Sequence, residues 1–282
     1  MSTLREKRKK ERRALRRRKT ADWTVVLILC AIAVCCGGYL VYHHWSVKQR
    51  ELEYEKLRQE ETLSAATEAV IEEPETEEST EETVIYCDPV YDFGQLREQN
   101  EDIYAWIVVP GTQVDYPLLQ SGTDNYYLDY NLDHSKGYPG CIYTNNCNQK
   151  DFTDYNTIFY GHNMKNGSMF GSIHSFEDET FFEEHPYIYV YTENERLTYE
   201  IYEAAKFTDV YIPAQYVINS REDRDRFLND VKEMVSDNKL HVRKDLEVGE
   251  DDRLITLSTC VNGERNHRYL VIGVLVETAV YR

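Results

Sequence analysis

The strongest pattern in the chain is an apolar run near its N-terminus. No charged residue occurs from Trp23 to Tyr42, where Val, Leu, Ile, Ala and Cys predominate. A helix of about 20 such residues spans the ~30 Å hydrocarbon core of a bilayer. Trp23, Tyr42 and Trp45 near its ends are the aromatic residues that favour the membrane–water interface. The pattern predicts one transmembrane anchor at residues 23–42.

A cleaved signal peptide is the alternative for this run. It would have a shorter apolar core and a small-residue cleavage site followed by a polar exit. Here the core is long, and the residues after it read Gly37-Gly-Tyr-Leu-Val-Tyr-His-His-Trp45. We therefore expect the anchor to be retained.

Charge sets the expected orientation of the anchor. The net charge is −18 in total, and residues 1–22 carry +8, which leaves −26 on the rest of the chain. A basic run of this kind is also typical of nucleic-acid binding. Because an apolar span follows it directly, we interpret residues 1–22 as a cytoplasmic tail. We expect a single-pass plasma-membrane protein whose residues 46–282 lie outside, and no nucleic-acid partner.

Residues 43–85 read as an acidic stalk between the anchor and a folded domain. Intermittent Leu and Tyr at 46–71 favour a short stalk helix. Residues 72–83 are too acidic and too poor in apolar side chains to form a core. We expect the whole stalk to be largely disordered and to act as a spacer.

The outer domain, residues 86–282, is rich in short apolar or alternating runs. Strands are predicted at 107–112, 114–119, 141–144, 157–160, 187–192, 197–208, 254–260 and 269–278. Short helices are predicted at 92–99 and 100–106, with Asp92 and Asn100 as caps. Apolar residues at helical spacing predict a longer amphipathic helix at 220–237. Many short strands with few helices indicate a mainly β domain, built as a closed or nearly closed barrel.

The candidate nucleophile is Cys260, at the end of the strand predicted over 254–260. Strand alternation places it on one face with Thr256 and Ser258. A polar turn follows, and Arg268 opens the next apolar strand, so two neighbouring strands would bring its guanidinium near the thiol. A guanidinium there favours the thiolate and donates hydrogen bonds to an oxyanion. The alternative for Cys260 is a buried structural cysteine. The alternative for the cation is Arg265, which we expect in the turn.

The candidate acid–base residue is His162, which follows an apolar strand and a glycine. An imidazole there can protonate a departing amine and deprotonate an incoming one. His267, close to Cys260 in sequence, is its rival. No two histidines have the spacing of metal ligands on one element, so we expect no metal.

The seven cysteines do not form a disulfide scaffold. Cys30, Cys35 and Cys36 lie in the apolar run, and the outer part has four more, without any Cys-x-x-Cys motif. Cys141 and Cys147 are near enough in sequence to bridge, and the sequence leaves that question open.

Together these residues resemble the sortases, membrane-anchored cysteine transpeptidases of Gram-positive bacteria. The matching strings are Thr256-Leu-Ser-Thr-Cys260 with Arg268 downstream, Tyr160-Gly-His-Asn163, Trp106-Ile-Val-Val-Pro-Gly-Thr112 and Val114-Asp-Tyr-Pro117. Serine within the cysteine string, the helices before the first strand and the helix at 220–237 resemble class B. The chain stops soon after its last predicted strand, without the C-terminal membrane segment typical of class C.

The resemblance implies an eight-stranded barrel and a two-step reaction without a cofactor. Cys260 would cleave a C-terminal sorting motif of a secreted protein and form a thioester. His162 would protonate the leaving amine and Arg268 would hold the oxyanion. An amine of a peptidoglycan precursor would then resolve the thioester, which leaves the secreted protein covalently attached to the cell wall. Substrate contacts are carried over to four further positions: Ser258, Leu128, Tyr211 and Ile212.

Three other functions stay open at this stage. The enzyme would be a pilus-polymerising sortase if its acceptor were a pilin lysine, and a surface cysteine protease if its acceptor were water. A membrane-tethered, non-catalytic binding module would use Cys260 only as a structural residue.

Overall fold

The computed structural model describes residues 2–65, 85–233 and 240–282. The chain forms two compact units, Met1–Glu53 and Tyr54–Arg282. Helix α1 (Ser2–Ala65) makes up the first unit and continues into the second. Among the described residues, α1 is the one helix long and apolar enough to cross a membrane, through a segment that begins at Trp23. By length and composition it is compatible with a single-pass anchor.

The end of α1 differs from the stalk expected at residues 43–85. Residues 43–65 are helical, and residues 66–84 lie outside the described residues. Tyr54 and Leu57, one helical turn apart, are buried within the second unit. The apolar residues that interrupt the charged sequence therefore pack against the domain.

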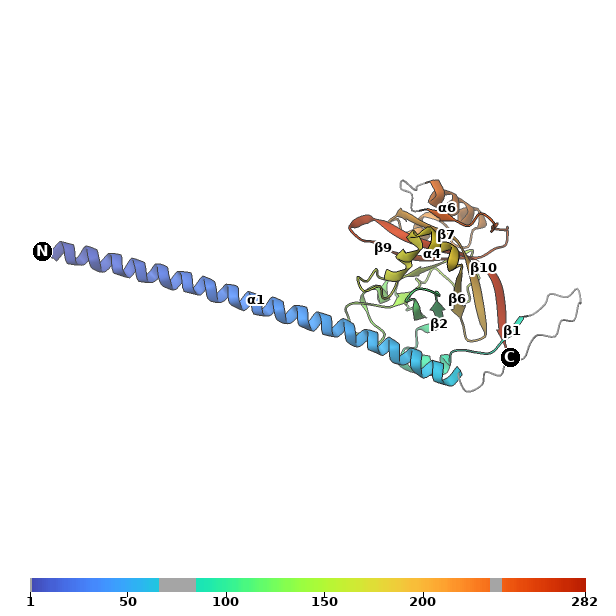
Figure 1. Ribbon diagram of the computed structural model, residues 1–282, viewed down its shortest axis with the longest axis horizontal. Coiled ribbons are helices and arrows are strands. Elements are labelled where there is room, and N and C mark those ends of the chain that lie inside the picture. The colour runs from blue at the N-terminus through green and yellow to red at the C-terminus, as the bar shows by residue number, and fades with distance from the viewer. Residues whose placement is uncertain (1, 66–84, 234–239) are drawn as a thin grey trace, which may run out of the picture. The chain divides into compact units, whose positions relative to one another are not determined.

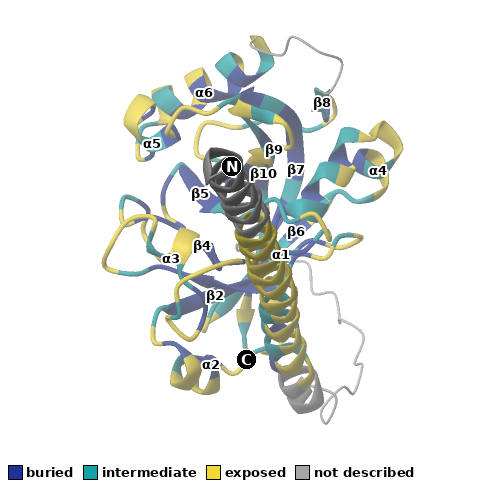
Figure 2. Ribbon diagram, turned by 90° about the vertical axis from the view of Figure 1, so that its left-hand side faces the viewer, coloured by how far each residue is buried: buried dark blue, intermediate teal, exposed yellow. Residues whose placement is uncertain are grey.

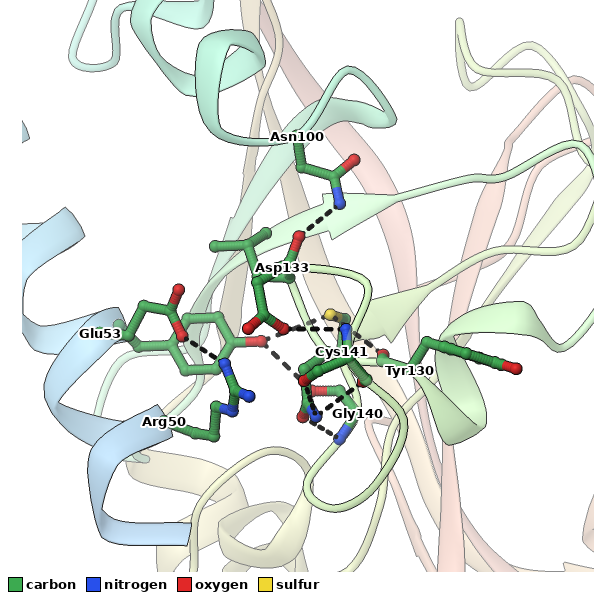
Figure 3. Close-up of polar contacts among 11 residues, drawn as sticks. Arg50, Glu53, Asn100, Tyr130, Asp133, Gly140 and Cys141 are labelled. Atoms are coloured by element: carbon green, nitrogen blue, oxygen red, sulfur yellow. Dashed lines mark hydrogen bonds and ion pairs between the residues drawn. The ribbon is translucent and has the colours of Figure 1, made fainter. Parts of the chain in front are cut away.

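Tyr54 and Arg58 anchor this helix end to the barrel wall. The Tyr54 hydroxyl donates to the carbonyl oxygen of Gly140 at 3.2 Å and lies 3.4 Å from the Cys141 sulfur. Figure 3 shows Gly140 and Cys141 with Tyr130, whose carbonyl accepts from the Cys141 thiol at 3.6 Å. Arg58 donates from Nε to the carbonyl of Asp115 at 2.8 Å. The last turns of α1 are thus part of the folded domain.

Eight strands close into a barrel, as expected from the sequence. Their order around the barrel is β10-β9-β5-β4-β3-β2-β6-β7, and β7 pairs back onto β10. Short strands β1 and β8 attach to β10 and β7 at the margins. The bounds are β1 Ile85–Cys87, β2 Ile103–Val108, β3 Asp115–Leu119, β4 Ile142–Tyr143, β5 Asn156–Tyr160, β6 Tyr187–Tyr191, β7 Glu195–Thr208, β8 His241–Val242, β9 Leu254–Val261 and β10 Glu264–Tyr281.

Short helices lie around the barrel (Figure 1). They are α2 Phe93–Gln99, α3 Tyr126–Asp129, the 3₁₀ helix η1 Gly171–Glu177, α4 Glu179–Glu184, α5 Ile212–Gln215 and α6 Arg221–Glu233. Asp92 caps α2 as expected, since its carboxylate accepts from the backbone N–H groups of Gly94 and Gln95. Helix α6 matches the predicted amphipathic helix up to Glu233, and residues 234–239 lie outside the described residues.

The prediction of a helix at residues 100–106 is wrong. Asn100 ends α2, and its side-chain oxygen accepts from the Asp102 N–H at 2.9 Å, which makes a turn instead of a helix cap. Strand β2 follows, with Ile103 to Ile107 all buried. A run that is apolar on both faces fits a fully buried strand as well as a helix.

The strands that carry the candidate site are largely buried (Figure 2) and separate two clusters of buried apolar side chains. Ile255 and Leu257 of β9 face the barrel interior together with Tyr269 of β10. Leu254 and Leu270 belong to a second cluster, under α6. Alternation therefore turns Ser258 and Cys260 to the outer wall of the barrel.

Candidate active site

A pocket of about 350 Å³ on the outer wall brings together the three residues predicted for catalysis. Cys260 of β9, Arg268 of β10 and His162, two residues after β5, all line it. Cys260 is exposed, and the other two are partly exposed. The nucleophile candidate therefore opens to solvent, whereas a structural cysteine would be buried.

Strand pairing explains how residues about a hundred positions apart meet. Strands β5 and β9 are parallel neighbours, with Tyr160 opposite Ser258. His162 and Cys260 each lie two residues beyond that pair, at the same end of both strands. In the antiparallel pairing of β9 with β10, Cys260 lies opposite Arg268.

Packing around Gly161 sets the direction of His162. A Cβ atom at Gly161 would lie 2.5 Å from Ile142 Cδ1 and 2.8 Å from Phe170 Cδ2, so only glycine fits there. His162 donates from Nε2 to the carbonyl oxygen of Leu128 at 2.8 Å. Its ring also lies 4.8 Å from that of Tyr138. The imidazole is held at the pocket wall by a hydrogen bond and an aromatic contact.

Backbone carbonyls near the start of β10 hold Arg268, and the pocket lining distinguishes it from its rival Arg265. Arg268 donates from Nη1 to the carbonyl oxygens of His267 at 3.0 Å and Arg265 at 3.4 Å. Arg265, which was expected in the turn, lies near the start of β10, is exposed and does not line the pocket. His267 is likewise outside the lining and contacts the Glu264 carboxylate at 2.8 Å. The geometry favours Arg268 and His162 over both alternatives.

All four residues expected to contact substrate line the same pocket: Ser258, Leu128, Tyr211 and Ile212. Ser258 and Ile212 are buried, and Ile212 also packs in the cluster under α6. Leu128 and Tyr211 are exposed at the rim. The Tyr211 hydroxyl accepts from Asn145 at 3.0 Å.

Sequence reasoning missed further polar groups in the lining. The hydroxyls of Tyr160 and Thr208 are buried and have no hydrogen-bond partner among the described residues. Burial raises the pKa of Tyr160, and it raises the pKa of Tyr211 to about 12, so both phenols are neutral near pH 7. Tyr211 was among the expected substrate contacts, and Tyr160 belongs to the Tyr160-Gly-His-Asn163 string, but no local signal marks Thr208.

Two residues contact the backbone of Cys260. Asn163 donates from Nδ2 to the Cys260 carbonyl oxygen at 2.7 Å, and His174 Nε2 lies 3.0 Å from the same oxygen. Asn163 lies directly after His162 in the Tyr160-Gly-His-Asn163 string, which is a weak signal. Nothing in the sequence points to His174, in η1.

The cysteines are free in the described structure. Cys141 and Cys147, which the sequence left open as a pair, are not bonded to each other. Over residues 2–65, 85–233 and 240–282, no three His, Cys, Asp or Glu side chains form a group that would hold a metal ion.

Comparison with known proteins gives one consistent result. A family model described as the sortase domain matches residues 107–276. Sortase B of Listeria monocytogenes is 35% identical over 168 residues, which are 58% of this chain and 65% of that protein. Sortase B of Staphylococcus aureus is 26% identical over 261 residues, 91% of this chain and 97% of that protein.

Solved structures agree with this result. The Staphylococcus aureus sortase B–substrate complex has a TM-score of 0.63 at 25% identity and covers 82% of this chain and 97% of that chain. A class B sortase of Streptococcus pyogenes involved in pilus biogenesis has a TM-score of 0.56 at 27% identity, over 65% of this chain and 97% of that chain.

Proposed function

Because the chain belongs to the sortase family and its relatives are of class B, we propose that it is a membrane-anchored cysteine transpeptidase that attaches secreted proteins to the cell wall. The observation that carries this proposal is the shared pocket of Cys260, His162 and Arg268. An exposed thiol, an imidazole and a guanidinium are the three groups that acyl transfer through a thioester requires.

In the first step Cys260 attacks the scissile carbonyl of a sorting motif. The Cys260 thiolate forms a bond to the carbonyl carbon while His162 carries the proton, and the Arg268 guanidinium stabilises the negative charge that develops on the carbonyl oxygen. The C–N bond then breaks, and the departing amine takes a proton from His162. A thioester between substrate and Cys260 remains.

In the second step an amine of a peptidoglycan precursor attacks the thioester carbon. His162 takes the proton of the attacking amine, the C–S bond breaks, and Cys260 leaves as the thiolate. The products are a new amide and the starting enzyme. Leu128 and Ile212 offer apolar contacts to the bound motif, and the Tyr160 and Thr208 hydroxyls are free to pair with its polar groups.

The proposed location follows from the same domain plan. Residues 23–42 would span the plasma membrane, with residues 1–22 on the cytoplasmic side, because basic flanks are retained there. Residues 43–85 would connect the anchor to the extracellular catalytic domain, residues 86–282. The pocket would then face secreted proteins and wall precursors.

The direct test incubates the full chain in detergent micelles with a panel of sorting-motif peptides and an amine acceptor. Product masses are measured with and without the amine. We expect an amide product with the acceptor, and no product from the Cys260→Ala variant. Cleavage that survives in Cys260→Ala would show that Cys260 is not the nucleophile, whereas a parent protein that binds the peptides without cleaving them would be a binding module. If the peptide is hydrolysed and the added amine gives no amide product, the enzyme is a protease that uses water as its acceptor.

A pilus-polymerising role is the second candidate. It is favoured by the similarity to the Streptococcus pyogenes class B sortase involved in pilus biogenesis. The two roles differ in the acceptor, since pilus assembly uses a lysine side chain of a pilin. Competition between a lysine-containing pilin-like peptide and a peptidoglycan-precursor peptide for the same thioester would decide between them.

A further inference from the structure

The carbonyl group of Cys260 lies two residues beyond Ser258, which forms the last residue pair between β9 and β5. Gly161 donates its N–H to the Ser258 carbonyl at 3.3 Å, so residue 258 of β9 is turned toward β5. Carbonyls two residues apart along a strand point to the same neighbour, so the Cys260 carbonyl does too. Its donor in a continued ladder would be the N–H of residue 163. Strand β5 ends at Tyr160, however, and Asn163 is bridged to Met169 instead.

Two side chains take the place of that missing donor. The Asn163 amide nitrogen lies 2.7 Å from the Cys260 oxygen and the His174 Nε2 lies 3.0 Å from it. The two nitrogens also lie within hydrogen-bond distance of each other, at 2.9 Å, so Asn163, His174 and the Cys260 carbonyl form one connected group. A backbone carbonyl has two lone pairs and accepts from both.

His174 is itself fixed from two sides. Its Nδ1 lies 2.8 Å from the Glu177 carboxylate. Its ring stacks on the buried Tyr269 ring at a centroid distance of 4.9 Å and an angle of 23°. Tyr269 follows Arg268 in β10, so the same contact ties His174 to the strand that carries the guanidinium.

We propose that Asn163 and His174 are positioning residues that hold the Cys260 carbonyl and thereby aim its thiol into the pocket. The peptide group after Cys260 determines the backbone dihedral ψ of this residue. The same peptide leads into Val261, the last residue of β9. Without the two donors this group has no hydrogen bond on its β5 side, and a displacement of about 1 Å at a reacting atom lowers turnover by about 10²-fold. The effect on turnover rests on the proposed transpeptidase function, whereas the hydrogen bonds do not.

The hydrogen bonds can be observed directly. Cys260-Val261 is the one Cys–Val pair in the sequence. Labelling the full chain in detergent micelles with carbonyl-¹³C cysteine and ¹⁵N valine therefore gives a single cross peak for this peptide. We expect His174→Phe, which keeps a ring on Tyr269 but has no donor, to move the carbonyl resonance upfield. Asn163→Ala should move it in the same direction.

The matched control is His185→Phe. His185 is partly buried, stacks on Phe181 at 4.0 Å, and has Nδ1 3.1 Å from the Phe181 carbonyl, but it does not line the pocket. This variant should leave the Cys260 cross peak unmoved. A peak that stays in place in His174→Phe, or that moves as far in His185→Phe, would overturn the proposal.

Kinetics tests the consequence. We expect kcat for peptide transfer to fall by about tenfold or more in His174→Phe and in Asn163→Ala, with KM within about twofold. His174→Gln places an amide donor near the former Nε2 and should recover most of kcat, which a merely structural role of the ring would not allow. The double variant should lose less than the product of the two single losses, because both donors serve one oxygen. Unchanged kcat despite a moved peak would contradict the positioning role.

The two readouts separate this proposal from the proposed function. A parent protein that transfers no peptide, but whose carbonyl peak moves in His174→Phe, would contradict the transpeptidase function and support the hydrogen bonds.

Discussion

Cys260 and Arg268 are directly opposite partners in the pairing of β9 with β10. Because the Cys260 carbonyl is turned toward β5, this pair is of the kind without mutual backbone hydrogen bonds, in which Cα atoms are about 4.5 Å apart and side chains are closest. Both side chains project from the outer wall. The relation between nucleophile and cation is therefore set by the backbone of two long strands.

This relation predicts that loss of the Arg268 guanidinium lowers turnover strongly. We expect Arg268→Ala to reduce kcat for peptide transfer by about 10²–10³-fold, the effect of removing one oxyanion donor. Arg268→Lys should recover only part of it, because an ammonium lacks the planar fork of donors. Arg265→Ala is the control, since that side chain is exposed near the start of β10 and does not line the pocket. Steady-state kinetics would refute the assignment if both alanine variants lost the same activity.

Gly161 offers a second prediction, since a methyl group there would collide with Ile142 and Phe170. Overpacking of a filled site destabilises by about 1–3 kcal/mol. We expect Gly161→Ala to lower the unfolding temperature and to lower kcat further, by displacing His162. Gly122→Ala is the matched control, because a Cβ atom there meets nothing within 4 Å. Thermal unfolding and kinetics of both variants would decide, and equal effects would contradict this packing account.

The parts of the site that could be predicted from sequence are those that local chain geometry determines. Cys260 and Arg268 belong to successive strands joined by a short turn, so their proximity follows from alternation and spacing. His162 required the resemblance, because its meeting with Cys260 depends on a parallel pairing between strands about a hundred residues apart. His174 had no signal, since its role depends on where η1 lies against β10.

The same distinction applies to the fold. The barrel followed from the number and alternation of short strands. A strand was expected at residues 107–112, whereas β2 runs from Ile103 to Val108. Its first part was read as a helix because it is buried on both faces, which removes the alternation, and because the Asn100 turn resembles a helix cap. The end of α1 was read as a spacer because Tyr54 and Leu57 are few among charged residues. Their burial depends on contacts with distant segments, including Gly140.

Glu203 of β7 predicts a pH-dependent stability. This residue is fully buried, and neither carboxylate oxygen has a hydrogen-bond partner among the described residues. Burial raises its pKa to about 8, although the positive charge of Lys232 opposes the rise. In the unfolded chain the carboxyl ionises near its usual value, so folding is penalised progressively as pH rises from about 4.5 to 8.

We therefore expect Glu203→Gln to remove this dependence. The variant should match the parent protein below about pH 4.5 and exceed its free energy of unfolding at pH 8, by a few kcal/mol at ~1.4 kcal/mol per pKa unit. Denaturant unfolding across this pH range measures the difference. Glu222→Gln on the exposed face of α6 is the control with the same charge change. A gain that does not depend on pH would show that Glu203 is ionised in the folded protein.

Thr208 leads to a prediction in which stability and substrate binding change in opposite directions. Its hydroxyl lies in the pocket lining, buried and without a hydrogen-bond partner among the described residues. An unpaired buried hydroxyl destabilises the free protein, so Thr208→Val, of nearly the same shape, should raise the free energy of unfolding by about 1 kcal/mol. If the hydroxyl pairs with the sorting motif, the same change should raise KM by about tenfold. Unfolding curves and peptide kinetics of one preparation measure both. A variant with raised stability and unchanged KM would mean that this hydroxyl does not contact the substrate.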